Sequence, residues 1–80
     1  MDELCTILMK IHEKEDMPAL LRDLLTPSEL QSVIERVQIF KMIKQGIPHR
    51  TISQKLKVSI AKVTRGSHAM QISKSIINLL

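Results

Sequence analysis

The stretch ISQKLKVSIAKVTR, residues 52–65, decides the fold of this 80-residue chain. Its apolar residues have the spacing of two short helices that cross over one small core and are joined by a tight turn; they are Ile52, Leu56, Val58 and Val63. Ser53 is small where the helices would approach closely, and the Ser59 hydroxyl can accept a hydrogen bond from a free backbone N–H of the second helix. The pattern predicts a helix-turn-helix, a DNA-binding unit; a purely structural corner is the alternative.

The second helix of this pair, expected from Ile60 to about Met70, has an outward side that suits a DNA groove. The residues that Val63 leaves free to point outward are short, methyl-bearing or cationic. They are Ile60, Ala61, Lys62, Thr64, Arg65 and His68. Lys57 stands where such turns often have glycine, and a left-handed backbone there would cost about 1 kcal/mol.

Charge is distributed unevenly along the chain. Residues 1–30 carry seven acidic and three basic side chains, whereas residues 31–80 carry nine basic side chains and only one acid, Glu35. A basic region centred on the predicted helix-turn-helix is what phosphate contacts require. A solvated basic face or an anionic membrane surface is the alternative interpretation.

The expected organisation is a single all-α domain of residues 1–80, with a dimerisation region at 1–46, the helix-turn-helix at 48–70 and a short C-terminal helix at 72–80. A domain this small has a thin core, so we expect a second copy to complete it, with an extended monomeric bundle as the alternative. The apolar positions expected at the dimer contact are Leu4, Ile7, Leu8, Ile11, Leu20, Leu21, Leu24 and Leu25. With the single cysteine Cys5 and no long apolar run, the expected location is the cytoplasm, away from membranes.

The best-marked helix start is Thr26-Pro27-Ser28-Glu29. Thr26 and Glu29 have the spacing of a capping box, and proline is favoured at the first helical position. This helix should run to about Gln45, before Gly46 and Pro48. Upstream we expect one helix from Asp2 to about Lys14 and a second, capped by Asp16, that ends near Leu24.

Residues that would support catalysis are scattered. The three histidines fall in three different predicted segments, and no glycine-rich phosphate loop occurs. We therefore expect neither an enzyme nor a metal site. Gly66 lies inside a predicted helix, where glycine costs roughly 1 kcal/mol relative to alanine, so something must come close to it. A neighbouring helix is the favoured interpretation, and a small ligand beside Arg65 is the alternative.

Three motifs together resemble the bacterial tryptophan repressor family: Leu25-Thr26-Pro27-x-Glu29, Arg36-Val37, and Ile60-Ala61-x-Val63-Thr64-Arg65-Gly66-Ser67. The resemblance covers about residues 24–70. It implies an intertwined all-helical homodimer that represses transcription from a palindromic DNA operator, with L-tryptophan as corepressor and no other cofactor. A related regulator with a different effector or none is the alternative, and a DNA-anchoring or protein-binding module is a third.

The resemblance also implies a ligand site. Arg36 and Arg65 match the arginines that sandwich the indole ring, and Arg65 also meets the ligand carboxylate; a guanidinium stacks on an aromatic face and keeps its charge for an anion. Gly66 matches the residue that lets the ring approach the backbone. The ligand would tilt the DNA-binding helices to the spacing of successive major grooves.

The polar groups of the ligand would meet further residues. Thr26 matches a residue near the carboxylate, and the backbone carbonyls of Asp23 and Leu25 from the other subunit match those that receive the ammonium group. Ala69 departs from the pattern, because members such as the enterobacterial repressor have a serine there; the lost hydrogen bond is worth about 1 kcal/mol. The segment after Gly46 is one residue shorter than in the family.

For DNA, the family pattern points to Ile60, Ala61 and Thr64 at the base edges, where the apolar pair can meet thymine methyl groups. Arg50 and Lys62 are expected at the groove or the phosphates. The complete set of expected DNA-binding residues is Ser59, Ile60, Ala61, Lys62, Thr64 and Arg50.

Overall fold

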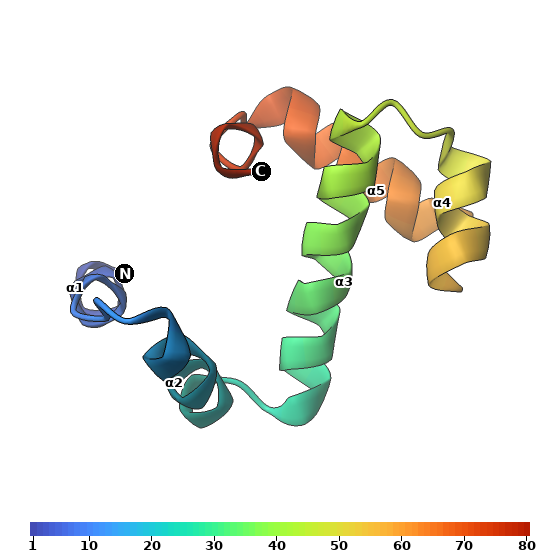
Figure 1. Ribbon diagram of the computed structural model, residues 1–80. Helices are drawn as coiled ribbons and strands as arrows, with labels where there is room; N and C mark the ends of the chain where they lie inside the picture. The colour runs from blue at the N-terminus through green and yellow to red at the C-terminus, as the bar shows by residue number, and fades with distance from the viewer. The chain divides into compact units, whose positions relative to one another are not determined.

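The computed structural model describes residues 1–80 and consists of helices and turns without a strand (Figure 1). The helices are α1 (Asp2–Met9), α2 (Met17–Leu24), α3 (Pro27–Lys44), α4 (His49–Leu56) and α5 (Ile60–Ile72), with the 3₁₀ turns η1 (Lys14–Asp16) and η2 (Ile77–Leu79). The predicted all-α class is confirmed. Contacts divide the chain into two compact units, residues 1–31 and 32–80. None of the helices combines the length and the hydropathy needed to cross a lipid bilayer.

The N-terminal unit differs from expectation at its first break. α1 ends at Met9, several residues before Lys14. The side chains from His12 to Asp16 are all polar or charged, so a longer helix would have had no apolar face to bury there. Asp16 does precede α2, but its carboxylate accepts no backbone hydrogen bond. The predicted Asp16 cap is wrong because η1 runs directly into α2 with helical dihedral angles.

The start of α3 has the predicted capping box. The Thr26 backbone N–H donates to Glu29 Oε1 at 2.9 Å, and the Glu29 backbone N–H donates to Thr26 Oγ1 at 3.2 Å. The backbone hydrogen bond from Thr26, supported by the hydroxyl contact, holds the pKa of the Glu29 carboxyl below its ordinary value of 4.5. The charged form of Glu29 is therefore part of the folded helix end.

We predict that this cap makes stability depend on pH. Because the pKa of Glu29 is lower in the folded than in the unfolded chain, its stabilising effect is complete above the unfolded pKa. The effect is lost as the pH falls through the lowered folded-state pKa. Urea unfolding at a series of pH values should show that, as the pH falls, wild type loses stability relative to Glu29→Gln, whose amide does not titrate. Parallel curves for the two proteins would refute this role.

α3 ends where the sequence indicates, at Lys44, one residue before the expected end. Gly46 has φ of +79°, a conformation that glycine adopts without strain. The Ile47 N–H donates to the Met42 carbonyl at 3.1 Å, and the Gly46 N–H donates to the Ile43 carbonyl at 2.9 Å. These two hydrogen bonds form a Schellman motif, which turns the chain out of α3 toward α4.

The core of residues 32–80 joins α3, α4 and α5. Ile52 and Val63 are completely buried and Ile39 is 3% exposed, while Leu56 and Val58 are half-buried and pack against them. The four apolar residues that predicted the corner therefore meet in one cluster. α4 and α5 pack directly on each other, as the spacing predicted.

The turn between α4 and α5 is held by short polar contacts. Ser59 Oγ accepts a hydrogen bond from the Lys62 backbone N–H at 3.2 Å, which confirms the predicted N-cap. Ser53 Oγ donates to the Val58 carbonyl at 2.6 Å, a contact that uses the small side chain at the helix crossing. Lys57 has φ of +56° and ψ of +43°, the left-handed conformation expected at this position.

We predict that Lys57→Gly stabilises the protein. Relief of the left-handed strain outweighs the extra backbone entropy of glycine, which leaves a net gain of about 0.5–1 kcal/mol in the free energy of unfolding. Lys55→Gly is the matched control, because Lys55 lies inside α4 and should lose about 1 kcal/mol. Thermal or urea unfolding measures both. A loss of stability in Lys57→Gly would contradict the strain.

The predicted helix over residues 72–80 is not formed. Ile72 is the last residue of α5, and Ser73 is extended, with φ of −126° and ψ of 127°. The Ser73 and Ser75 hydroxyls lie 3.3 Å apart, and serine side chains compete with helical hydrogen bonding. Only η2 follows, and the Lys44 ammonium donates to the carbonyls of Ile77 and Leu80. The roles of the predicted regions 1–46 and 48–70 stay predictions.

Candidate ligand pocket and nucleic-acid surface

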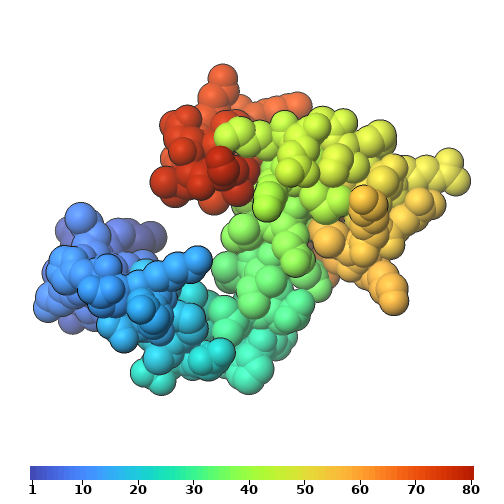
Figure 2. Space-filling view, viewed as in Figure 1, coloured from blue at the N-terminus to red at the C-terminus, as the bar shows by residue number.

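The first half of α5 has one buried and one exposed side. Val63 is completely buried, whereas Ile60 is 50% exposed and the neighbouring residues also face solvent. We call the exposed residues Ile60, Ala61, Lys62 and Thr64 the outer face of α5. Arg50 of α4 is exposed as well. The end of α4, in yellow-orange, projects from the surface of this unit (Figure 2). The outer face is accessible to a large partner.

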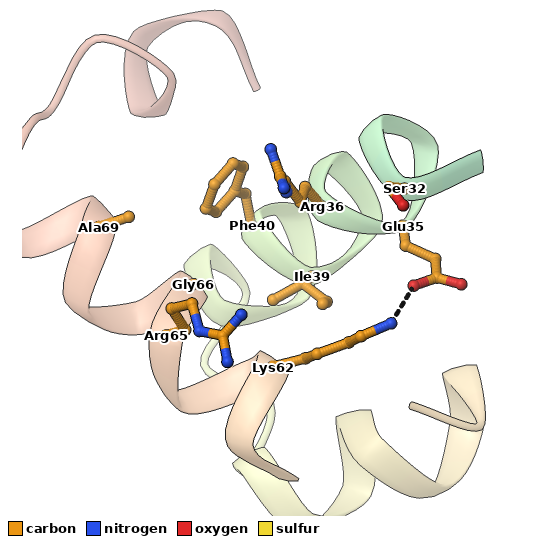
Figure 3. A pocket seen from close by; sticks show the side chains of 9 residues that line it. All are labelled: Ser32, Glu35, Arg36, Ile39, Phe40, Lys62, Arg65, Gly66 and Ala69. Carbon is orange, nitrogen blue, oxygen red and sulfur yellow. Dashed lines mark hydrogen bonds and ion pairs between the residues drawn. The ribbon is translucent and has the colours of Figure 1, made fainter. Parts of the chain in front are cut away.

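A cavity of about 310 Å³ lies between α3 and α5 (Figure 3). Its lining consists of Ser32, Glu35, Arg36, Ile39, Phe40, Lys62, Arg65, Gly66 and Ala69. This volume is at the lower end of the range for small-molecule sites. The structure thus brings together three of the predicted ligand residues, Arg36 from α3 and Arg65 and Gly66 from α5.

Gly66 allows α5 to approach α3. A Cβ atom built at Gly66 would lie 2.8 Å from Ile39 Cγ2, closer than side chains tolerate, and 3.7 Å from Phe40 Cε1. The sequence predicted that something packs close to Gly66, and the structure shows that it is the neighbouring helix α3, the favoured interpretation. The same missing side chain also leaves backbone exposed at the cavity wall.

Charged and apolar side chains share the lining of this cavity. Arg36, Lys62 and Arg65 are cationic, and Glu35 is the single anion among the lining residues. Lys62 Nζ lies 3.3 Å from Glu35 Oε1, and the pair reaches from α5 to α3 (Figure 3). The excess of positive charge favours a ligand with an anionic group, and the guanidinium groups favour a flat ring.

Sequence reasoning missed four residues of this lining, Ser32, Glu35, Ile39 and Phe40, of which Glu35 and Phe40 stand out. Glu35 is the only acid in residues 31–80, and Phe40 is the only aromatic residue of the chain. Each is the only residue of its kind there, which could have drawn attention to it. Composition alone, however, does not indicate that either residue lies opposite α5. The contact between Glu35 and Lys62 joins residues far apart in sequence, and it depends on how closely the two helices approach.

The remaining predicted ligand residues belong to the unit of residues 1–31. The Thr26 hydroxyl accepts the Glu29 backbone N–H in the capping box. Asp23 is in the last turn of α2, and Leu25 is the half-buried residue that follows α2. Their roles at a ligand, and those of the DNA-binding residues, stay predictions. No group of three histidine, cysteine or acidic side chains is placed to hold a metal ion.

The family model described as Trp repressor protein matches residues 1–78. The chain belongs to the Trp repressor protein family. A Trp operon repressor homolog of Xylella fastidiosa (strain M23) is 36% identical over 69 residues, which are 85% of this chain and 75% of that protein. A Trp operon repressor homolog of Aliivibrio fischeri (strain MJ11) is 36% identical over 70 residues, 86% of this chain and 65% of that protein. No solved structure gives a significant match.

Membership in the Trp repressor family confirms the resemblance drawn from the motifs. It makes the chain a DNA-binding repressor of transcription and not an enzyme. The matched residues include both helices that line the cavity as well as the complete α4–α5 pair.

We predict that Gly66→Ala destabilises the protein by about 1 kcal/mol, because the clash with buried Ile39 outweighs the gain in helix propensity. Ile39→Leu removes the Cγ2 methyl from the clash and should cost less than about 1.5 kcal/mol by itself. The double variant should therefore be more stable than the sum of the single effects. Urea unfolding of the four proteins measures this coupling, and simple additivity would show that Ile39 does not limit the approach.

Proposed function

We propose that this chain works in the cytoplasm as a homodimeric repressor that binds a palindromic operator when L-tryptophan occupies the cavity between α3 and α5. The observation that carries the proposal is the placement of Arg36, Arg65 and Gly66 around one cavity. The names of the relatives, Trp operon repressor homologs, support tryptophan as the effector.

The chemistry of the cavity fits this ligand. In the proposed complex the indole ring lies between the guanidinium groups of Arg36 and Arg65, and the Arg65 charge also attracts the carboxylate. Gly66 is part of the cavity lining, and in the proposed complex the ring approaches the backbone of α5 there. Thr26 and the carbonyls of Asp23 and Leu25 complete the site from the family pattern, with the two carbonyls supplied by the partner subunit.

The dimer is supported by apolar surface on the N-terminal helices and on α3. Neither α1 nor α2 contains a buried residue, and Leu4, Ile7 and Leu24 are 37–44% exposed. α3 exposes Val33, Ile34 and Val37 to a similar degree. Covering surface of this kind is the main favourable term in association. A second copy supplies such a cover in the intertwined dimer.

DNA contact is assigned to the outer face of α5. Ile60 and Ala61 meet thymine methyl groups, and Thr64 donates to or accepts from a base edge. Arg50, Lys62 and the Ser59 region meet the groove wall or the phosphates. Nine basic side chains in residues 31–80 against one acid supply the attraction to the phosphate backbone.

One observation favours a second candidate, a repressor of the same family with a different effector or none. Ala69 lines the cavity where family members such as the enterobacterial repressor have a serine, so a hydroxyl contact to the ligand ammonium is missing. A ligand that carries an anion and a ring but no ammonium group would lose nothing at this position.

Calorimetric titration with L-tryptophan and with indole-3-propionate, which lacks the ammonium group, separates the candidates. We expect L-tryptophan to bind, and to increase the affinity for a palindromic duplex selected from a random-sequence library. Arg65→Ala should weaken tryptophan binding by roughly tenfold or more, the value of one charge-assisted contact. Arg50→Ala is the control, since it should weaken DNA binding and leave tryptophan binding unchanged. Intact DNA binding with no heat from millimolar tryptophan would reject tryptophan as the effector.

A further inference from the structure

The ion pair between Lys62 and Glu35 connects the outer face of α5 to the cavity. Lys62 belongs to the outer face, yet its ammonium group lies 3.3 Å from a carboxylate oxygen of α3 (Figure 3). The Lys62 side chain is 51% exposed and the Glu35 side chain is 25% exposed. The pair is therefore in contact with solvent, and either side chain can exchange its partner. Both residues also line the cavity.

This pair is singular in the protein. It is the only ion pair in the structure, and Glu35 is the only acid among the nine bases of residues 31–80. The one carboxylate in the basic region is therefore used to neutralise a cation on the surface assigned to DNA. Residues 31–80 contain eight other basic side chains, and Glu35 pairs with none of them.

Lys62 cannot serve Glu35 and a DNA phosphate equally well. A lysine contributes to DNA affinity because its contact with a phosphate releases a condensed counterion. While the ammonium is neutralised by Glu35, that release is reduced. We propose that the Glu35–Lys62 pair is an autoinhibitory contact, which lowers the DNA affinity of the ligand-free protein and is released when a ligand fills the cavity. The proposal rests on the function proposed above and adds a regulatory device to the same site.

Release follows from the position of the pair. The Lys62 side chain extends from α5 toward α3 along the cavity, with Arg65 on the same side of α5 (Figure 3). A ligand held by Arg36 and Arg65 takes up space beside this extended side chain and changes the separation of Lys62 from Glu35. Glu35 thus acts on DNA binding as a positioning residue, through Lys62.

The restraint is tested with Glu35→Gln, which keeps the size of the side chain and removes its charge. Without ligand, this variant should bind the selected operator about two- to fivefold more tightly than wild type, the range that exposed ion pairs provide. The slope of log affinity against log salt concentration should steepen by about 0.9, the value of one added phosphate contact. Fluorescence anisotropy measures both quantities. Unchanged ligand-free affinity would overturn the proposal.

Removing a negative charge strengthens DNA binding by itself. The effect of Glu35→Gln is therefore measured again in a protein that already carries Lys62→Gln. In that background Glu35→Gln should change the affinity and the salt slope much less, because no ammonium is left to release. An equal effect in both backgrounds would show a general charge effect and overturn the restraint. A thermal melt for each variant confirms that the proteins compared are folded.

The release is tested by the gain in DNA affinity on adding L-tryptophan. If the ligand breaks the pair, Glu35→Gln already has part of that gain, so its response should shrink by the same factor by which its ligand-free affinity rises. An undiminished response would overturn release by the ligand. If wild type itself gains no affinity, tryptophan is rejected as the corepressor, and the ligand-free comparison still decides whether Glu35 restrains Lys62.

Discussion

The close approach of α5 to α3 at Gly66 is the constraint on which the rest of this structure depends. It brings Ile39 within reach of the α5 backbone, and Ile39 belongs to the same buried cluster as Ile52 and Val63. The cavity walls and the support of the outer face therefore share one anchor. Under the proposed function, a ligand that presses on the α3–α5 contact therefore also acts on α5, the helix whose outer face we assign to DNA.

The small size of that anchor makes such a response physically reasonable. Only four residues of the whole chain are buried, and the cluster around Ile52 is completed by half-buried side chains. A core of this kind supplies limited resistance to small shifts of a helix. A ligand needs only a modest difference in affinity between two positions of α5 to change their populations. The thin core is thus compatible with the proposed dependence of DNA binding on a ligand.

The sequence predicted the features that neighbouring residues determine. The Thr26–Glu29 capping box, the Ser59 cap and the left-handed Lys57 each depend on a few consecutive residues, and all three are present. The helix over residues 72–80 was wrong because its apolar residues follow serines that favour an extended chain. The cavity was predicted only in part, through the resemblance at Arg36, Arg65 and Gly66. Glu35 was missed because its partner is fixed by helix packing, which no local pattern records.

Under the proposed function, the net charge of the chain does not by itself make DNA binding depend on the ligand. Nine bases attract DNA whether or not the cavity is filled, since most of them lie away from it. A side chain that belongs to both sites links the DNA-binding charge to the cavity directly. Lys62 is the one residue that belongs to the outer face of α5 and also lines the cavity. In our proposal, placing the single acid of the basic region against this lysine puts an electrostatic contribution to DNA binding under the influence of the ligand, whereas the same acid beside a base away from the cavity would only weaken binding.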